Sequence, residues 1–162
     1  MSAQPRGAAM PEDDLDRIMA VMTAAFDPQY GEAWTRRQVS DALVFGQCHY
    51  HLIGAEGTAP AEGERAAGFA LLRTTLDEEE LLLFAVLPAF RRRGLGARLL
   101  GAVIDAAGTQ GIRRILLEMR DGNPAESLYR QFGFHDIGRR PQYYRRADGK
   151  RIDAVTFARQ IG

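Results

Sequence analysis

The stretch from residue 81 to residue 96 constrains the fold more than any other part of the chain. Residues 81–87 read LLLFAVL and are apolar at every position. This pattern predicts a central strand covered on both faces, which Pro88 stops. Residues 91–96 read RRRGLG, and apolar residues at helical spacing follow them, so a helix is expected to start near Gly94. A buried strand is thus joined by a short glycine-containing turn to the first turn of a helix.

This turn predicts an anion-binding site. The first amides of a helix have no partner within the helix, and the helix dipole favours negative charge beside them. Gly94 and Gly96 are expected to let the backbone approach a ligand closely, and phosphate is the natural ligand. The stretch lacks the GK[ST] ending of a P-loop, and Leu99 stands where a dinucleotide-binding fingerprint has its third glycine. Both of these nucleotide-binding motifs are therefore excluded.

The rest of the chain alternates helix and strand patterns on either side of this unit. Thr35 and Gln38 form a capping-box pattern. Asn123 and Pro124 predict another helix start, with Glu126 at the capping-box position and Gly133 as the terminating residue. The predicted elements are a helix from Asp13 or Asp14 to Asp27, a helix after Thr35, strands 49–54 and 67–75 as a hairpin, strand 81–87, a helix from Gly94 to Gly108, strand 113–119, a helix before Gly133, and strands 134–138 and 152–158 joined by a basic loop.

The order ααβββαβαββ predicts an α/β fold, an α+β arrangement around a mixed sheet. A chain of 162 residues is long enough for one domain with a substantial core. We assign residues 12–162 to that domain. Residues 1–11 lack the long apolar centre of a secretory signal and are expected to form a flexible tail.

Composition excludes several classes of function. Twenty-one basic residues balance twenty-one acidic ones, so overall charge predicts no attraction to nucleic acid or to a membrane surface. No apolar run is long enough to cross a bilayer. Cys48 is the single cysteine, which excludes an internal disulfide and a clustered thiolate metal site and fits a cytoplasmic location. His49 and His51 share a strand face without a third ligand nearby, so no metal is expected.

Four segments together carry a resemblance to a known family. The turn RRRGLG matches the pyrophosphate motif Q/R-x-x-G-x-G/A of the GNAT acetyltransferases, and it lies between a strand and a helix as in that family. It is followed by LEMR at 117–120, LYRQFGF at 128–134 and RRPQYYRRADGKRIDA at 139–154. Over residues 68–158 the chain resembles the GNAT enzymes that acetylate the N-terminal alanine of a ribosomal protein.

The resemblance implies a GNAT fold, acetyl-CoA as the acetyl donor and a set of site residues. Glu118 corresponds to the family's general base and Tyr129 to its general acid. The residues implied for acetyl-CoA are Phe84, Ala85 and Val86 along the acetyl-pantetheine arm, Arg91, Arg92, Arg93, Gly94, Leu95 and Gly96 at the pyrophosphate, and Asn123. The spacing from Asn123 to Tyr129 is one residue shorter than the usual family spacing.

Taken without the resemblance, the same residues have other interpretations. Glu118 is expected among leucines, where burial would raise its pKa, or else paired with Arg113 or Arg120. Tyr129 fits plain core packing equally well. The aromatic residues Trp34, Tyr143 and Tyr144 would line a peptide groove or pack as ordinary core and rim side chains.

Three hypotheses for the function follow. The first is transfer of an acetyl group to the N-terminal α-amine of a protein by direct attack in a ternary complex. The second is acetylation of a small-molecule amine, because one fold serves many acceptors. The third is an acyl-CoA-binding module without catalysis, which the shortened spacing before Tyr129 suggests.

Overall fold

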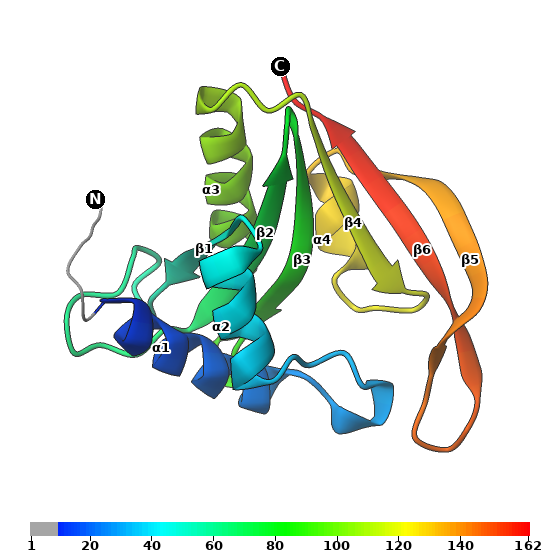
Figure 1. Ribbon diagram of the computed structural model, residues 1–162, viewed down its shortest axis with the longest axis horizontal. Coiled ribbons are helices and arrows are strands. Elements are labelled where there is room, and N and C mark those ends of the chain that lie inside the picture. Colours follow the sequence, from blue (N-terminus) through cyan, green and yellow to red (C-terminus); the bar gives the residue numbers. More distant parts are fainter. Residues whose placement is uncertain (1–9) are drawn as a thin grey trace.

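The computed structural model describes residues 10–162 and contains one six-stranded sheet flanked by helices (Figure 1). Its main elements are α1 (Met10–Ala25), α2 (Arg36–Phe45), β1 (Cys48–Ile53), β2 (Gly68–Thr75), β3 (Glu78–Val86), α3 (Leu95–Thr109), β4 (Arg114–Arg120), α4 (Glu126–Gln131), β5 (His135–Arg145) and β6 (Arg151–Gln160). Short 3-10 turns lie at Pro28–Tyr30 and Pro88–Phe90. The predicted order ααβββαβαββ and the mixed α/β class are confirmed. Residues 1–9 of the predicted tail lie outside the described part.

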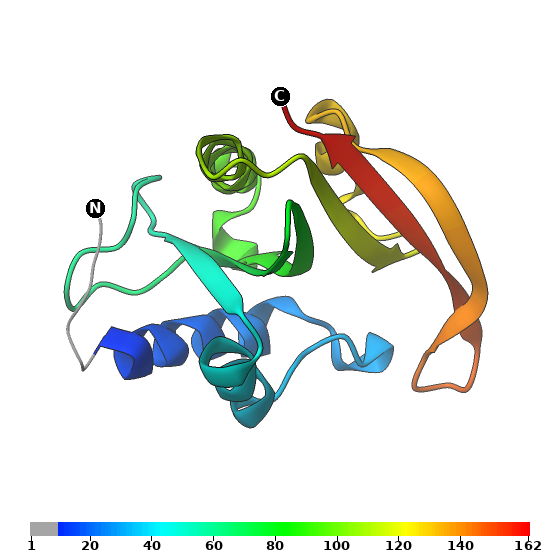
Figure 2. The ribbon, with the colours of Figure 1, turned by 45° about the horizontal axis from the view of Figure 1, so that its top comes forward.

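The strands are arranged in the order β1-β2-β3-β4-β6-β5. The central pair, β3 and β4, is parallel, and every other neighbouring pair is antiparallel. Helices α1 and α2 cover one face of the sheet, and α3 and α4 cover the other (Figure 2). The sheet therefore separates two hydrophobic layers.

Each layer is built from the alternating side chains of the strands and one stripe of each helix. Large and fully buried members of the α3 and α4 layer include Leu99, Ile115 and Phe157. In the layer under α1 and α2, Ile18 and Phe69 are equally inaccessible. Burying a side chain of this size contributes about 1.5–3 kcal/mol, so these two layers hold the sheet and its helices in register.

An irregularity in β3 places its side chains for the site. Leu71 pairs with Leu83 and Leu72 pairs with Leu81, so Leu82 is an extra residue in the ladder. This β-bulge turns Leu81 toward the α3 layer and Leu83 toward the α1 layer. The prediction that 81–87 is covered on both faces is confirmed, and Leu82 and Phe84 are half-buried because they also line a cavity.

The parallel pairing of β3 with β4 is short. It runs from Glu78 opposite Arg114 to Leu81 opposite Leu117 and then stops. Beyond this point the two strands part, as Figure 1 shows. The later half of β3 therefore has an edge without a strand partner in the middle of the sheet.

Several element boundaries differ from the predictions. Helix α1 already begins at Met10, and α3 passes through Gly108 to end at Thr109. Strands β5 and β6 are much longer than predicted, because antiparallel pairing continues through an irregularity between Arg140 and Tyr144. Most of the predicted basic loop is therefore strand.

Of the two helix starts predicted from capping patterns, the one at α2 is confirmed and the one at α4 is wrong, because the N-cap of α4 is Ala125, not Asn123, and no side chain of the described residues caps it. The capping box of α2 is confirmed: the Thr35 hydroxyl accepts from the Gln38 amide at 3.1 Å, and the Thr35 amide donates to the Gln38 side chain at 2.7 Å. At α4 the predicted box does not form. The Glu126 carboxylate accepts from Arg130 at 2.9 Å, while the Asn123 side chain accepts from the Ala125 amide at 2.8 Å.

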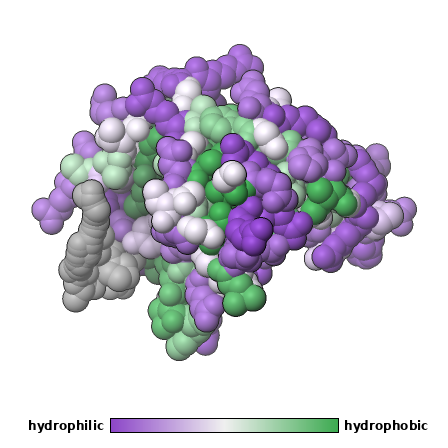
Figure 3. All heavy atoms as spheres, turned by 90° about the horizontal axis from the view of Figure 1, so that it is seen from above, coloured by the Kyte–Doolittle hydropathy of each residue, from purple (hydrophilic) through white to green (hydrophobic). Residues whose placement is uncertain are grey.

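The surface in Figure 3 is mainly hydrophilic, with hydrophobic residues gathered in a few places. Among the residues whose burial is described, 14–162, the exposed large hydrophobic side chains are Val44, Phe45, Leu76, Ile137 and Tyr143. Within residues 10–162, no helix combines the length and the hydropathy needed to cross a membrane.

Candidate active site

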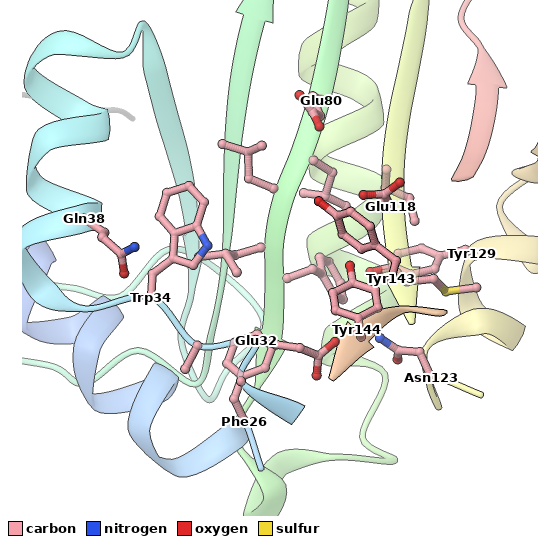
Figure 4. Close-up of a pocket in the computed structure, with 18 residues that line it drawn as sticks. Phe26, Glu32, Trp34, Gln38, Glu80, Glu118, Asn123, Tyr129, Tyr143 and Tyr144 are labelled. Carbon is pink, nitrogen blue, oxygen red and sulfur yellow. The ribbon is translucent and has the colours of Figure 1, made fainter. Parts of the chain in front are cut away.

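A cavity of about 420 Å³ lies where β3 and β4 part. Figure 4 shows side chains from both strands, from α4, from β5 and from residues 26–38 pointing into it. Its lining residues are Phe26, Gly31, Glu32, Ala33, Trp34, Gln38, Glu80, Leu81, Leu82, Leu83, Phe84, Leu117, Glu118, Met119, Asn123, Tyr129, Tyr143 and Tyr144. The predicted residues Glu118, Tyr129, Asn123 and Phe84 are thus brought together from three separate segments.

Glu118 reaches the cavity because β4 alternates its side chains. Leu117 and Met119 are buried under α3 and α4, which directs Glu118 to the opposite face. Its Oε2 lies 3.1 Å from the Arg140 guanidinium and 3.4 Å from the Thr156 hydroxyl, and its side chain is 23% exposed. The expected setting among leucines is therefore wrong, since the carboxylate has a cation beside it.

The pairing alternatives named for Glu118 are also resolved. Arg113 lies 4.0 Å from Asp77 near the start of β4, and Arg120 pairs with Glu32 at 3.3 Å. The partner of Glu118 is Arg140, from β5. Strand β6 lies between β4 and β5, so this pair depends on a long-range arrangement of three strands.

Tyr129 is buried in α4 at the inner end of the cavity. Its ring makes an edge contact with Phe84 and a tilted contact with Phe134, at centroid distances of 5.9 Å and 5.8 Å. Burial, and to a smaller extent the charge of Glu32, raises the pKa of the phenol above its ordinary value. Among the described residues none hydrogen-bonds the Tyr129 hydroxyl, so the structure supports both packing and a role for the proton.

Asn123 lies in the loop between β4 and α4. Its side-chain oxygen accepts from the Ala125 amide, and the same side chain lines the cavity (Figure 4). Glu126 donates its amide to the Asn123 carbonyl at 3.1 Å. These bonds fold the loop tightly, so that Tyr129 reaches the cavity in spite of the short spacing from Asn123.

The remaining β3 residues face away from the cavity with their side chains. Ala85 packs under α1 and α2, and Val86 packs under α3, with 6% and 9% exposure. Only their backbone edge faces β4, where no strand pairs with them. An extended ligand chain can hydrogen-bond to such an edge as an added strand would.

The turn from residue 91 to residue 96 has the geometry of an anion cradle. Arg92 and Gly94 both adopt left-handed backbone conformations, with φ of 65° and 77°. Among the described residues, no backbone hydrogen bond uses the amides of Arg92, Arg93 or Gly94. Alternating backbone conformations of this kind direct successive N–H groups into one concavity, just before the N-terminus of α3.

Arg91 is held by the protein itself. Its amide donates to the Pro88 carbonyl at 3.3 Å, and its guanidinium donates to the carbonyls of Val86 and Ala25, each at 3.2 Å. The contact with Ala25 ties the turn to the last residue of α1. The groups left for an anion are therefore those of residues 92–96.

Gly96 has a packing constraint in addition to the predicted role, which stays a prediction. A Cβ atom there would lie 3.2 Å from Leu128 Cδ2, so the absent side chain makes room for α4 to pack against α3. Gly94, by contrast, has open space around it and is required by its positive φ. Helix packing therefore favours glycine at position 96, and the backbone of the turn favours it at position 94.

The sequence indicated three aromatic residues of the cavity but missed two of its acids. Trp34, Tyr143 and Tyr144 all line the cavity (Figure 4). Burial, with the charges of Glu118 and Glu32, raises the pKa of Tyr144 to about 12. The overlooked acids are Glu32 and Glu80, which both line the cavity. A lone glutamate in a turn gives no periodic signal, and Glu80 ends a run of acidic residues that is typical of solvated surface.

The other candidate side chains lie outside this cavity. His49 bonds to buried Glu79 at 3.0 Å, and its ring is 6.0 Å from that of His51. Burial, and secondly the charge of His49, lowers the pKa of His51. Cys48 is half-buried, and within residues 10–162 no group of three or more His, Cys, Asp or Glu could hold a metal ion.

Fold and site together define a class of protein. A mixed sheet whose central parallel strands part over a cavity, with a turn of unbonded amides between β3 and α3, suits a transferase with a phosphate-bearing donor. The sequence matches the Acetyltransferase (GNAT) family over residues 17–134. The chain belongs to this family, and it is an N-acetyltransferase with acetyl-CoA as donor.

Three of the proteins that this chain resembles share one activity in their names. The ribosomal protein bS18-alanine N-acetyltransferase of Haemophilus influenzae is 37% identical over 97 residues, which are 60% of this chain and 66%, just under two thirds, of that protein. The Salmonella typhimurium enzyme of the same name is 41% identical over 123 residues, or 75% of this chain and 80% of that protein. The crystal structure of the ribosomal-protein-S18-alanine N-acetyltransferase from Escherichia coli superimposes with a TM-score of 0.77 at 29% identity, covering 93% of this chain and 89% of that one.

Proposed function

We propose that the protein transfers the acetyl group of acetyl-CoA to the N-terminal α-amine of a protein, and that the alanine N-terminus of ribosomal protein S18 is its acceptor. The observation that carries this proposal is the meeting of Glu118, Tyr129 and Asn123 in one cavity where β3 and β4 part. The names of the relatives at about 40% identity support the choice of acceptor.

A terminal α-amine needs only one weak general base to become a nucleophile, and the site offers one in Glu118. A terminal α-amine has an ordinary pKa of about 7.7–8.0 and is partly neutral near pH 7, whereas a lysine amine near 10.4 is almost fully charged. Glu118 carries an ion pair with Arg140 and still lines the cavity, so its carboxylate can take a proton directly or through one water. An α-amine therefore suits this site better than a lysine side chain.

Tyr129 supplies the matching acid. Bound acetyl-CoA brings the thioester whose sulfur must leave as a thiol. A phenol with the ordinary pKa of about 10 is already protonated at neutral pH, and the raised pKa of Tyr129 makes it a weaker acid. Its ring contacts with Phe84 and Phe134 fix the ring. In the ternary complex the hydroxyl can give its proton to the sulfur as the bond between carbonyl carbon and sulfur breaks and negative charge develops on the leaving thiolate.

The donor side is built from backbone groups. The edge of β3 at Phe84 to Val86 has no strand partner and offers hydrogen bonds to an extended arm, except at the Val86 carbonyl, which accepts from Arg91. Residues 92–96 offer amides to a diphosphate. Asn123 lies in the loop between β4 and α4. In this arrangement backbone amides bind the phosphates of acetyl-CoA, and the charged side chains inside the cavity are not needed for them.

A competition between amines tests the proposal. Acetyl-CoA is mixed with a peptide that carries the S18 N-terminus, the same peptide with a blocked α-amine and an internal lysine, and a panel of small amines. Thiol release is measured, and mass spectrometry locates the acetyl group. We expect rapid acetylation of the free α-amine alone; transfer confined to a small amine or to the lysine would refute the proposed acceptor.

A further inference from the structure

The segment from residue 28 to residue 34 forms one wall of the cavity, and we call it the acceptor wall. Gly31, Glu32, Ala33 and Trp34 of this segment line the cavity directly. Figure 4 shows Glu32 and Trp34 on the side of the cavity away from Asn123 and Tyr129. The wall belongs neither to the sheet nor to a long helix, so its position must come from other contacts.

Arg120 provides the strongest of these contacts. Its guanidinium lies over the Tyr30 ring at 3.7 Å from the centroid, and its Nε is 3.3 Å from Glu32 Oε1. The side chains of Arg120 and Glu32 are only 13% and 15% exposed, unlike most ion pairs of this protein. A planar guanidinium that stacks and donates at the same time fixes both partners in one orientation.

The same strand carries the proposed base. Glu118 and Arg120 are two residues apart on β4, so they project from the same face of the sheet. Arg120 is the last residue of β4, where the strand has already parted from β3. The strand that positions Glu118 therefore also positions the acceptor wall, through Arg120.

The hairpin turn after β5 holds the wall from its other side. The Ala147 amide donates to the Gln29 carbonyl at 2.8 Å, and Arg146 donates to the Gln29 side chain at 3.4 Å. Gly31 then reverses the chain with a φ of 62°, which returns Glu32 toward the cavity. The hairpin thus positions the start of the wall, while Arg120 positions its centre.

Glu32 depends on this arrangement. Burial raises the pKa of its carboxyl, and the charge and hydrogen bond of Arg120 oppose that effect. Without Arg120 a carboxylate would be left unpaired in a half-buried position, and the chain around it would move toward solvent to hydrate it. Such a movement would displace Trp34 as well, because the two residues are separated only by Ala33.

We propose that Arg120 is a positioning residue for the acceptor: through Tyr30 and Glu32 it holds the acceptor wall in place and thereby sets the affinity for the amine substrate, not for acetyl-CoA. The inference rests on the proposed function for its substrate. The chemistry excludes Arg120 from proton transfer itself, since a guanidinium stays protonated in proteins.

Steady-state kinetics with the acceptor peptide provides the first test. For Arg120→Met we expect the acceptor KM to rise about tenfold, because a displaced wall weakens substrate positioning. We expect kcat and the KM for acetyl-CoA to stay within about twofold, the pattern of lost ground-state binding. Arg120→Lys, which keeps the charge, should recover part of the loss. Arg113→Met, in an exposed ion pair, is the matched control and should match the wild type.

Fluorescence provides a second test that needs no turnover. Trp34 is the single tryptophan of the chain, so its quenching by acrylamide reports on the wall alone. We expect stronger quenching in Arg120→Met, and in Tyr30→Ala if the methionine variant fails to fold, but not in Arg113→Met. Unchanged quenching, or equal losses for both substrates, would overturn the proposal. A wild type that acetylates no peptide would instead refute the proposed function, and the quenching would still decide the role of Arg120.

Discussion

Replacing Tyr129 by phenylalanine removes one oxygen from the cavity and leaves the ring in place. The ring is 5% exposed and is held by its contacts with Phe84 and Phe134. Since no described residue hydrogen-bonds the hydroxyl, the substitution breaks no bond in the fold. We therefore expect the free energy of unfolding to change by less than about 1 kcal/mol.

The effect on catalysis should be far larger. A positioned general acid contributes about 10²–10⁴-fold to a rate, so kcat of Tyr129→Phe should fall by at least about a hundredfold. The affinity for acetyl-CoA should not change, because we propose that the donor binds along the β3 edge and at the turn of residues 92–96. Tyr143→Phe also removes an oxygen from the cavity, but from a side chain that is 50% exposed; it should act on the acceptor KM and leave kcat unchanged.

The pH dependence gives an internal check. Burial, and secondly the charge of Glu32, raises the pKa of Tyr129. The phenol therefore stays protonated at pH values above about 10, the ordinary pKa of a tyrosine. Wild-type kcat should therefore show no loss from phenol ionisation between about pH 7 and pH 9. Stopped-flow detection of thiol release measures kcat, and calorimetry measures the affinity for acetyl-CoA. A variant that keeps more than half of the wild-type kcat would refute the assignment of Tyr129 as the acid.

Three further substitutions probe the base, the turn and the fold. Glu118→Gln should lower kcat by about a hundredfold without weakening acetyl-CoA binding; Glu126→Gln, on the surface of α4, should leave both constants unchanged. Gly94→Val and Gly111→Val each place a β-branched side chain at a backbone position with positive φ, so each should lower the free energy of unfolding in urea by about 1–2 kcal/mol. Calorimetry should show weaker acetyl-CoA binding only for Gly94→Val. Equal binding by these two variants would contradict the anion cradle. Thr35→Ala should cost about 1 kcal/mol in urea unfolding, since it removes the capping box of α2; an unchanged midpoint would show that the cap contributes little.

The parts of the fold that sequence could predict are those fixed by neighbouring residues. The capping pair Thr35 and Gln38 needs only local geometry, and it forms as expected. The apolar run before Pro88 and the glycine at the start of α3 likewise act within a few residues. The order of helices and strands followed from such signals.

The parts that sequence could not predict depend on residues far apart in the chain. Arg140 meets Glu118 only because β6 lies between their strands and sets the register of both. The role of Gly96 depends on Leu128, which a different helix supplies. Glu32 enters the cavity wall because Arg120 stands at the end of β4. In each case the position of a side chain is decided by packing between elements.

The central claim is that acetyl-CoA lies along the open edge of β3 with its sulfur beside Tyr129 and its carbonyl facing Glu118 across the cavity. A crystal structure of the protein with a bisubstrate analogue, in which CoA is joined to the acceptor peptide through its α-amine, measures this directly. We predict the Tyr129 hydroxyl at about 2.6–3.2 Å from the sulfur or one water away, the diphosphate on the amides of residues 92–96, and the peptide against Trp34 and Tyr144. A sulfur placed outside the cavity, or a diphosphate away from that turn, would contradict the account.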